Sequence, residues 1–195
     1  MKKIILLTIL SGLFAGSMAF AQKKKHVKHA PAPKVTEASA SAKDTLLPYL
    51  KNPKFPVFRL LMMDSTTMFN TNTLAEGRPI MLFYFGAECD HCFKAIEKLL
   101  PGMDSLSDVQ IVMATFSNPT PIRAFYERFH LSKYKNITIG RDNDFFLGPF
   151  YGARSVPCVA MYDKHKKFLK KWEDAASIHA LTATELYTTS LLKAK

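Results

Sequence analysis

The chain has 195 residues, 48% of them hydrophobic, with a formal net charge of +11 and three cysteines. More than half of the positive excess lies in the first 44 residues, so the charge argues against a nucleic-acid-binding domain. Small secreted scaffolds stapled by disulfides have a larger and even number of cysteines. Three cysteines indicate instead one working pair and one left over.

The first 21 residues predict a secretory signal peptide. Met1-Lys2-Lys3 is a basic start, residues 4–14 form an apolar run, and Ala19-Phe20-Ala21 offers small residues for cleavage. The alternative is an uncleaved anchor, but the run is shorter than the roughly 20 residues that a bilayer span needs. We therefore expect export, to the periplasm, and no stable membrane span after cleavage.

Residues 22–44 are rich in Lys, Ala, Pro and Ser and have almost no large apolar side chains. Such a segment cannot bury enough surface to offset the entropy of ordering, so it predicts a disordered basic tether. Residues 45–195 are long enough for one domain with its own core.

Alternating strands and helices are predicted within this domain. Residues 55–61 predict a short strand, and residues 64–69 a turn into another. The apolar run 80–85 is bounded by turn residues, as in a strand buried on both faces of a sheet. The later elements are a helix over 92–100 that Pro101-Gly102 ends, a strand over 109–114, a helix opened by Pro121, a strand over 157–162, its hairpin partner over 168–172, and a helix over 178–192.

From residue 80 the predicted order is β-α-β-α-β-β-α. Helices between the early strands imply parallel crossovers, and the late hairpin adds an antiparallel pair. The sequence therefore predicts an α/β fold in which a central mixed sheet is flanked by helices.

Cys89 and Cys92 stand directly after the predicted strand 80–85 and open the helix that follows. A helix N-terminus presents unpaired N–H groups and a partial positive charge, which favour a thiolate. The C-x-x-C spacing at such a place is typical of a dithiol redox centre, with Cys89 as the exposed attacking thiol and Cys92 as the resolving thiol. A zinc site needs four ligands and the sequence has no second paired cluster, so we expect no metal.

The segment from about residue 52 to residue 194 resembles the thioredoxin superfamily, and most of all the exported TlpA-like and ResA-like thiol–disulfide oxidoreductases and their redoxin relatives. The resemblance rests on residues 83–92 and on Ser155-Val156-Pro157. It implies a thioredoxin-like fold with an N-terminal hairpin extension before residue 80. It also implies that Pro157 is cis and packs against the dithiol, and that the Val156 backbone docks a substrate strand beside Cys89.

Three residues depart from the family pattern. Phe83 stands where a buried acid is usual, Glu88 where an aromatic residue is usual, and His91 where a proline is usual. An imidazolium at His91 would stabilise the Cys89 thiolate and make the pair more oxidising, whereas the negative charges of Asp90 and Glu88 oppose this. We expect Glu88, Asp90 and His91 to tune the redox potential of the cysteine pair, with the sign of their net effect undetermined.

Cys158 follows Pro157 directly, a position near the dithiol in the family. It is a candidate third redox thiol, although a strand cysteine is more often a small buried hydrophobe.

These observations predict an exported enzyme, a thiol–disulfide oxidoreductase. Its partners would be protein thiols or disulfides and an electron donor or acceptor of the cell envelope; we expect no organic cofactor and no nucleic acid. A peroxiredoxin-like peroxide reductase is one alternative, but Leu82 and Gly86 occupy the Pro and Thr/Ser positions of its Pro-x-x-x-Thr/Ser-x-x-Cys pattern. A copper-binding module and a non-catalytic thioredoxin-fold module with a vestigial dithiol are the others.

Overall fold

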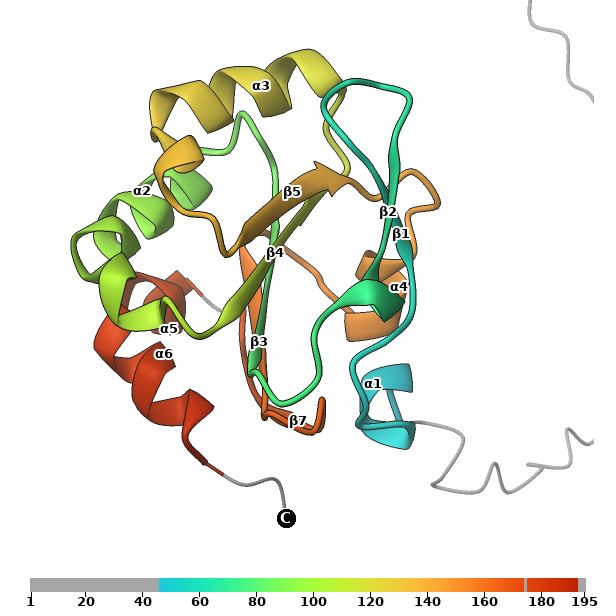
Figure 1. The fold of residues 1–195 in the computed structure, drawn as a ribbon, viewed down its shortest axis with the longest axis vertical. Coiled ribbons are helices and arrows are strands. Elements are labelled where there is room, and N and C mark those ends of the chain that lie inside the picture. The colour runs from blue at the N-terminus through green and yellow to red at the C-terminus, as the bar shows by residue number, and fades with distance from the viewer. Residues whose placement is uncertain (1–45, 174, 193–195) are drawn as a thin grey trace, which may run out of the picture. The chain divides into compact units, whose positions relative to one another are not determined.

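A computed structural model of the chain describes residues 46–173 and 175–192. The predicted signal peptide and tether lie outside these residues. Within the described part, seven strands form one sheet in the order β2-β1-β5-β4-β3-β6-β7 (Figure 1). The strands are β1 (Arg59–Leu61), β2 (Met68–Asn70), β3 (Ile80–Phe85), β4 (Gln110–Thr115), β5 (Ile137–Arg141), β6 (Cys158–Tyr162) and β7 (Phe168–Trp172). The α-helices are α1 (Pro48–Lys51), α2 (Asp90–Leu99), α3 (Pro119–Arg128), α4 (Leu147–Tyr151), α5 (Ala175–Ala180) and α6 (Ala183–Ser190), and the 3-10 helices are η1 (Thr71–Thr73), η2 (Leu100–Leu106) and η3 (Leu131–Lys133).

The sheet is mixed, as the sequence predicts. Strands β3, β4 and β5 run parallel, whereas β6 pairs antiparallel with both β3 and β7. The expected N-terminal extension is the antiparallel hairpin β1–β2, which joins the sheet at β5 through the pair Leu61 and Arg141. The predicted thioredoxin-like arrangement of a mixed sheet flanked by helices is therefore confirmed.

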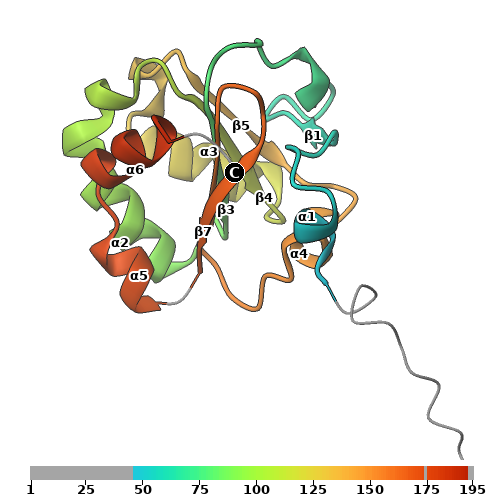
Figure 2. The ribbon, with the colours of Figure 1, turned by 90° about the horizontal axis from the view of Figure 1, so that it is seen from below.

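Helices cover both faces of the sheet (Figures 1 and 2). Side chains alternate along a strand, so Phe83 and Phe85 enter one core with α2, α3, α5 and α6. Leu82 and Tyr84 enter a second core on the opposite face, with α1 and α4. Every residue of β3, β4 and β6 is buried, which explains why their sequences are almost entirely apolar, with Gln110 and Thr115 as polar residues at the two ends of β4.

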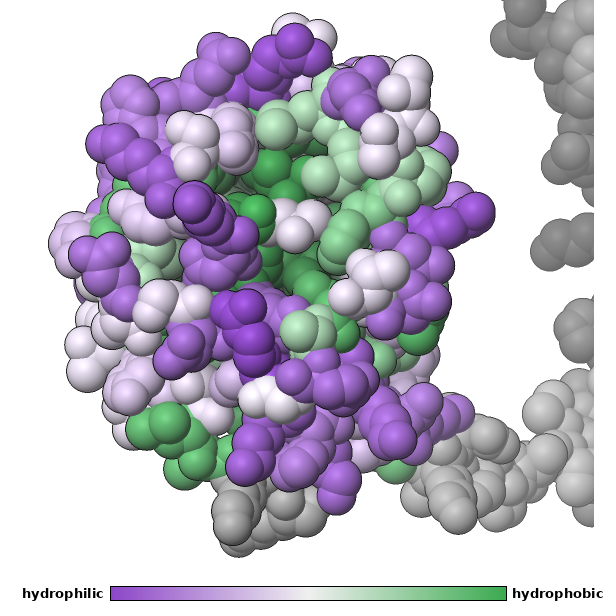
Figure 3. Space-filling model, viewed as in Figure 1, coloured by the Kyte–Doolittle hydropathy of each residue, from purple (hydrophilic) through white to green (hydrophobic). Residues whose placement is uncertain are grey.

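Strand β5 is the largest error of the sequence prediction, which places no strand between residues 114 and 157. The segment contains three consecutive β-branched residues, Ile137-Thr138-Ile139, in which apolar and polar side chains alternate. This is a strand signal, but a short one. Gly140 lets the hairpin approach, because a Cβ there would lie 2.9 Å from both the Leu60 Cβ and the Leu61 carbonyl oxygen. In the view of Figure 3, the surface over β5 is apolar and surrounded by hydrophilic side chains.

Three helix boundaries also differ from the prediction. Pro101-Gly102 ends α2 but not the helical path, because Pro101 lies in the first turn of η2, where a missing N–H costs nothing. Helix α3 begins at Pro119 rather than at Pro121. The C-terminal helix is two helices, since the Thr182 side chain accepts a hydrogen bond from the Glu185 N–H at 3.1 Å and caps α6.

Among the described residues, no helix has the length and apolar character to span a bilayer.

Candidate active site

Cys89 lies in the short turn between strand β3 and helix α2. It is the N-cap residue of α2, in an extended conformation, and its side chain caps no helix N–H group. Its own N–H donates to the Gly86 carbonyl at 3.2 Å, and its carbonyl accepts from the Phe93 N–H at 3.0 Å. The predicted position at the start of the helix is confirmed, and it leaves the half-buried Sγ of Cys89 beside the helix N-terminus.

Gly86 makes room for this turn. A Cβ at this position would lie 3.3 Å from the Cβ of Cys89, 3.6 Å from the ring of Phe116 and 3.7 Å from a methyl group of Val156. The next residue, Ala87, donates its N–H to the Ser117 hydroxyl at 2.9 Å. The turn that carries Cys89 is thereby fixed to the segment that follows β4.

Cys92 lies in the first turn of α2 and is fully buried. Its Sγ accepts a hydrogen bond from the Gly86 N–H at 3.5 Å, and its side chain hydrogen-bonds that of Cys89. Burial raises the pKa of the Cys92 thiol far above its ordinary value and the Cys89 thiol raises it further, while the Gly86 N–H lowers it only in part. Cys92 is therefore a neutral thiol at pH 7, and the two cysteines differ in burial, because Cys89 is half-buried whereas Cys92 is fully buried.

The segment before β6 comes back to Cys89 from 67 residues further along the chain. The Val156–Pro157 peptide bond is cis, as the resemblance implies. The Cys89 thiol donates to the Val156 carbonyl oxygen at a distance of 3.7 Å from Sγ. The structure thus brings together Cys89, Cys92 and Val156. Pro157, the residue after Val156, is buried.

The three tuning candidates lie at the rim of the site. Glu88, Asp90 and His91 are all exposed, and Asp90 is the acidic residue in the first turn of α2. None of them is among the groups that shift the Cys92 pKa. Their effect on Cys89 remains a prediction.

Phe83, which stands where the family has a buried acid, is fully buried and its ring lies 5.8 Å from that of Phe85. The groups that shift the Cys92 pKa are its own burial, Cys89 and Gly86, with no carboxylate among them.

Cys158 lies apart from the dithiol. It is fully buried in the core cluster that contains Tyr84 and Tyr162, whereas Cys92 belongs to the cluster on the other face of the sheet. Burial raises the pKa of Cys158 to about 12; the Lys171 charge lowers it and the Glu173 charge raises it. Both the burial and the raised pKa of Cys158 fit a cysteine that packs as a small hydrophobic side chain. A role for Cys158 as a third redox thiol stays a prediction.

Phe116 lies beside Cys89 and Val156, although the sequence prediction does not single it out. It directly follows β4, is 41% exposed, and its ring contacts Tyr84 at 6.0 Å between centroids. Its ring tip, the Val156 side chain and the Cys89 Cβ all lie within 3.7 Å of the place that a Cβ on Gly86 would occupy. An exposed aromatic residue just after a buried strand is the available signal, but it does not reveal which loop it faces.

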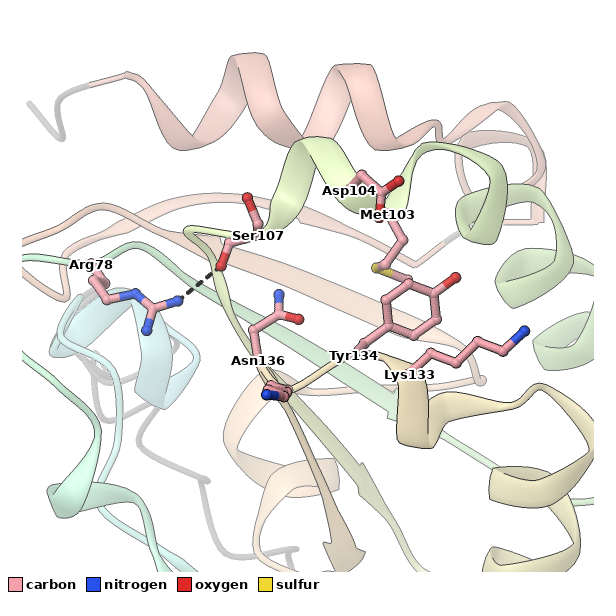
Figure 4. A pocket seen from close by; sticks show the side chains of 8 residues that line it. Arg78, Met103, Asp104, Ser107, Lys133, Tyr134 and Asn136 are labelled. Atoms are coloured by element: carbon pink, nitrogen blue, oxygen red, sulfur yellow. Dashed lines mark hydrogen bonds between the residues drawn. The ribbon is translucent and has the colours of Figure 1, made fainter.

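The cavity drawn in Figure 4, of about 370 Å³, lies away from the dithiol. Its lining residues Arg78, Ser107 and Asn136 precede β3, β4 and β5, so the cavity is at the amino ends of the parallel strands. Cys89 follows the carboxyl end of β3. In the part of the chain described, no group of three or more His, Cys, Asp or Glu side chains is placed to hold a metal ion.

Alkylation tests the difference between the three thiols. Iodoacetamide is expected to label Cys89 in the folded, reduced protein at neutral pH, and Cys92 and Cys158 only after denaturation. The reaction needs a thiolate and access, and both other cysteines are fully buried with raised pKa values. Peptide mapping by mass spectrometry identifies the labelled site. Labelling of Cys92 as fast as Cys89 would contradict the assigned roles.

Comparison with known proteins places this geometry in a fold family. A secreted disulfide oxidoreductase of Mycobacterium tuberculosis, described as homologous to E. coli DsbE, is 16% identical; the match covers 64% of this chain and 96% of that one, with a TM-score of 0.51. The thioredoxin domain of a thiol-disulfide oxidoreductase from Bacteroides vulgatus is 14% identical, with coverages of 65% and 91% and a TM-score of 0.52. StoA from Bacillus subtilis is 16% identical, with coverages of 69% and 96% and a TM-score of 0.51.

No family model matches the chain, and no curated protein matches it. At these identities the likeness establishes the fold. The chain has a thioredoxin-like fold, and the resemblance predicted from residues 83–92 and 155–157 is confirmed at that level.

Proposed function

We propose that the protein is an exported thiol–disulfide oxidoreductase that exchanges disulfides with proteins of the cell envelope through Cys89 and Cys92. The observation that carries the proposal is the arrangement of three groups. A half-buried thiol at a helix N-terminus lies above a buried neutral thiol and 3.7 Å from the Val156 carbonyl oxygen. The signal-peptide pattern at the N-terminus supports export.

The chemistry proceeds in two balanced steps. The Cys89 thiolate attacks one sulfur of a substrate disulfide, forming a mixed disulfide and releasing the other substrate sulfur as a thiolate that takes up a proton. Cys92 then gives up its proton and attacks the Cys89 Sγ, which forms the Cys89–Cys92 disulfide and frees the second substrate thiol. Two electrons pass from the dithiol to the substrate, and the same steps in reverse oxidise a substrate dithiol.

Docking of the substrate is assigned to the segment around Val156. Its carbonyl oxygen already accepts a hydrogen bond at the sulfur that reacts. A substrate strand that pairs with this backbone would bring its own sulfur to Cys89 while its side chains meet Phe116, an exposed ring at the border of the site.

A redox titration of the purified protein tests the proposal. In glutathione buffers the pair is expected to titrate as one two-electron couple, with a potential between about −270 and −120 mV, the span from thioredoxin to DsbA. A value near the lower end would assign a reductase and one near the upper end an oxidase. A pair that does not titrate, or consumption of hydrogen peroxide as fast as thiol exchange, would contradict the proposal.

A further inference from the structure

A carboxylate at the end of strand β7 lies against the segment that leads to Val156. Glu173 is mostly buried, with 20% of its side chain exposed. Its Oε1 accepts a hydrogen bond from the Arg154 N–H at 2.5 Å, and the Ser155 N–H also donates to the carboxylate. Two successive backbone donors of an exposed loop therefore converge on one acidic side chain.

Lys171 completes the arrangement from the same strand. Its Nζ donates to Glu173 Oε2 at 2.6 Å and to the Tyr151 carbonyl oxygen at 3.0 Å. Tyr151 is the last residue of α4, so the cation fixes the start of the loop while the carboxylate fixes its end. Only 15% of the Lys171 side chain is exposed, so water has little access to its ammonium group and cannot easily take the place of Glu173 as its partner.

The two groups hold each other in the charged form. Burial raises the Glu173 pKa, but the hydrogen bonds from Lys171 and the loop N–H groups outweigh it, so the pKa is lowered. Burial lowers the Lys171 pKa, but the bond to Glu173 outweighs it, so that pKa is raised. The pair is therefore ionised at neutral pH, and charge-assisted bonds of this kind are about twice as strong as neutral ones.

The anchored N–H groups are immediately followed by the docking carbonyl. Ser155 donates to Glu173, and the next residue, Val156, accepts from Cys89. A shift of the 154–155 backbone moves the Val156 carbonyl relative to the Cys89 sulfur unless the φ and ψ angles between them absorb it, because consecutive peptide units share a Cα. From this chain of contacts we infer that Glu173, held by Lys171, is a positioning residue that sets the docking segment against Cys89.

This inference rests on the proposed function, because a docking segment matters only if a protein substrate docks there. It makes a selective prediction. A protein disulfide needs the Val156 backbone in place, whereas a small reagent such as DTNB needs only the Cys89 sulfur. Loss of Glu173 should therefore slow exchange with a protein and leave exchange with the reagent unchanged.

The test compares single-turnover rate constants of the reduced full chain with insulin and with DTNB. For Glu173→Ala the rate constant with insulin is expected to fall about 10- to 100-fold, the usual cost of a misplaced reacting group. Glu173→Gln, which can still accept from the Arg154 N–H, should retain part of the rate. The rate constant with DTNB should be that of the wild type in both variants.

Glu185→Gln is the matched control. Glu185 also accepts hydrogen bonds from β7, from the Lys170 Nζ and the Trp172 Nε1, each at 3.0 Å, and its partners in these bonds lie outside the docking loop. Glu185→Gln should leave both rate constants unchanged. An unchanged insulin rate in Glu173→Ala would overturn the inference, and so would a loss of insulin rate in Glu185→Gln equal to that in Glu173→Gln. A wild-type protein inert toward both disulfides would instead overturn the proposed function.

Discussion

Replacing Cys89 with serine is expected to lower the rate constant for insulin disulfides by about 100-fold or more, to the uncatalysed level. Cys89 carries the half-buried sulfur at the helix N-terminus, 3.7 Å from the docking carbonyl, whereas Cys92 has no exposed surface. A serine hydroxyl at neutral pH is a far weaker nucleophile than a thiolate, and Cys92 stays a neutral thiol. Stopped-flow measurement of the reduced variant gives the rate constant directly.

Cys92→Ser completes this experiment. Cys89 can still attack, but no second thiol resolves the product, so a mixed disulfide with the substrate should accumulate and survive on a non-reducing gel. Cys158→Ala is the control, expected to exchange like the wild type because Cys158 packs in the other core cluster. If Cys92→Ser releases its substrate normally and Cys158→Ala does not, Cys158 is the resolving thiol and the assignment is wrong.

The sequence predicts the strand and the helix start around the dithiol well because their signals are local. Strand β3 is a six-residue apolar run with the bounds 80–85 that the turn residues on either side indicate. Cys89 and Cys92 are separated by less than one helical turn, so their relation follows from the start of α2. The link to Val156 is not local, and it came only from the resemblance to a family.

What the sequence leaves out depends on contacts between distant segments. Strand β5 is short and only partly apolar, and it becomes a strand because β4 supplies its pairing partner along its whole length. Phe116 and Glu173 look like ordinary surface residues of a loop and a strand end. Phe116 is placed at the site by its approach to Gly86, about 30 residues earlier in the chain. Glu173 is placed there by the N–H groups of Arg154, 19 residues earlier, and of Ser155.

Phe125→Ala is expected to lower the free energy of unfolding by about 3–5 kcal/mol, the usual cost of removing a buried aromatic ring. Phe125 on α3 is 1% exposed, and its ring centroid lies 4.6 Å from that of Phe85, 4.7 Å from that of Phe129 and 5.9 Å from that of Phe93. It therefore joins the end of β3 to helix α2, whose N-cap residue is Cys89. Domains are stable by about 5–15 kcal/mol in total, so this loss is a large part of it.

Denaturant unfolding of the reduced protein measures the change, and Phe145→Ala is the matched control. Phe145 is 56% exposed and should change the free energy of unfolding by no more than about 0.5 kcal/mol. Because the Phe125 ring supports α2 at the dithiol, the variant should also alkylate Cys92 faster than the wild type under native conditions, through more frequent local opening. Equal costs for the two substitutions would contradict the stabilising role assigned to the Phe125 ring.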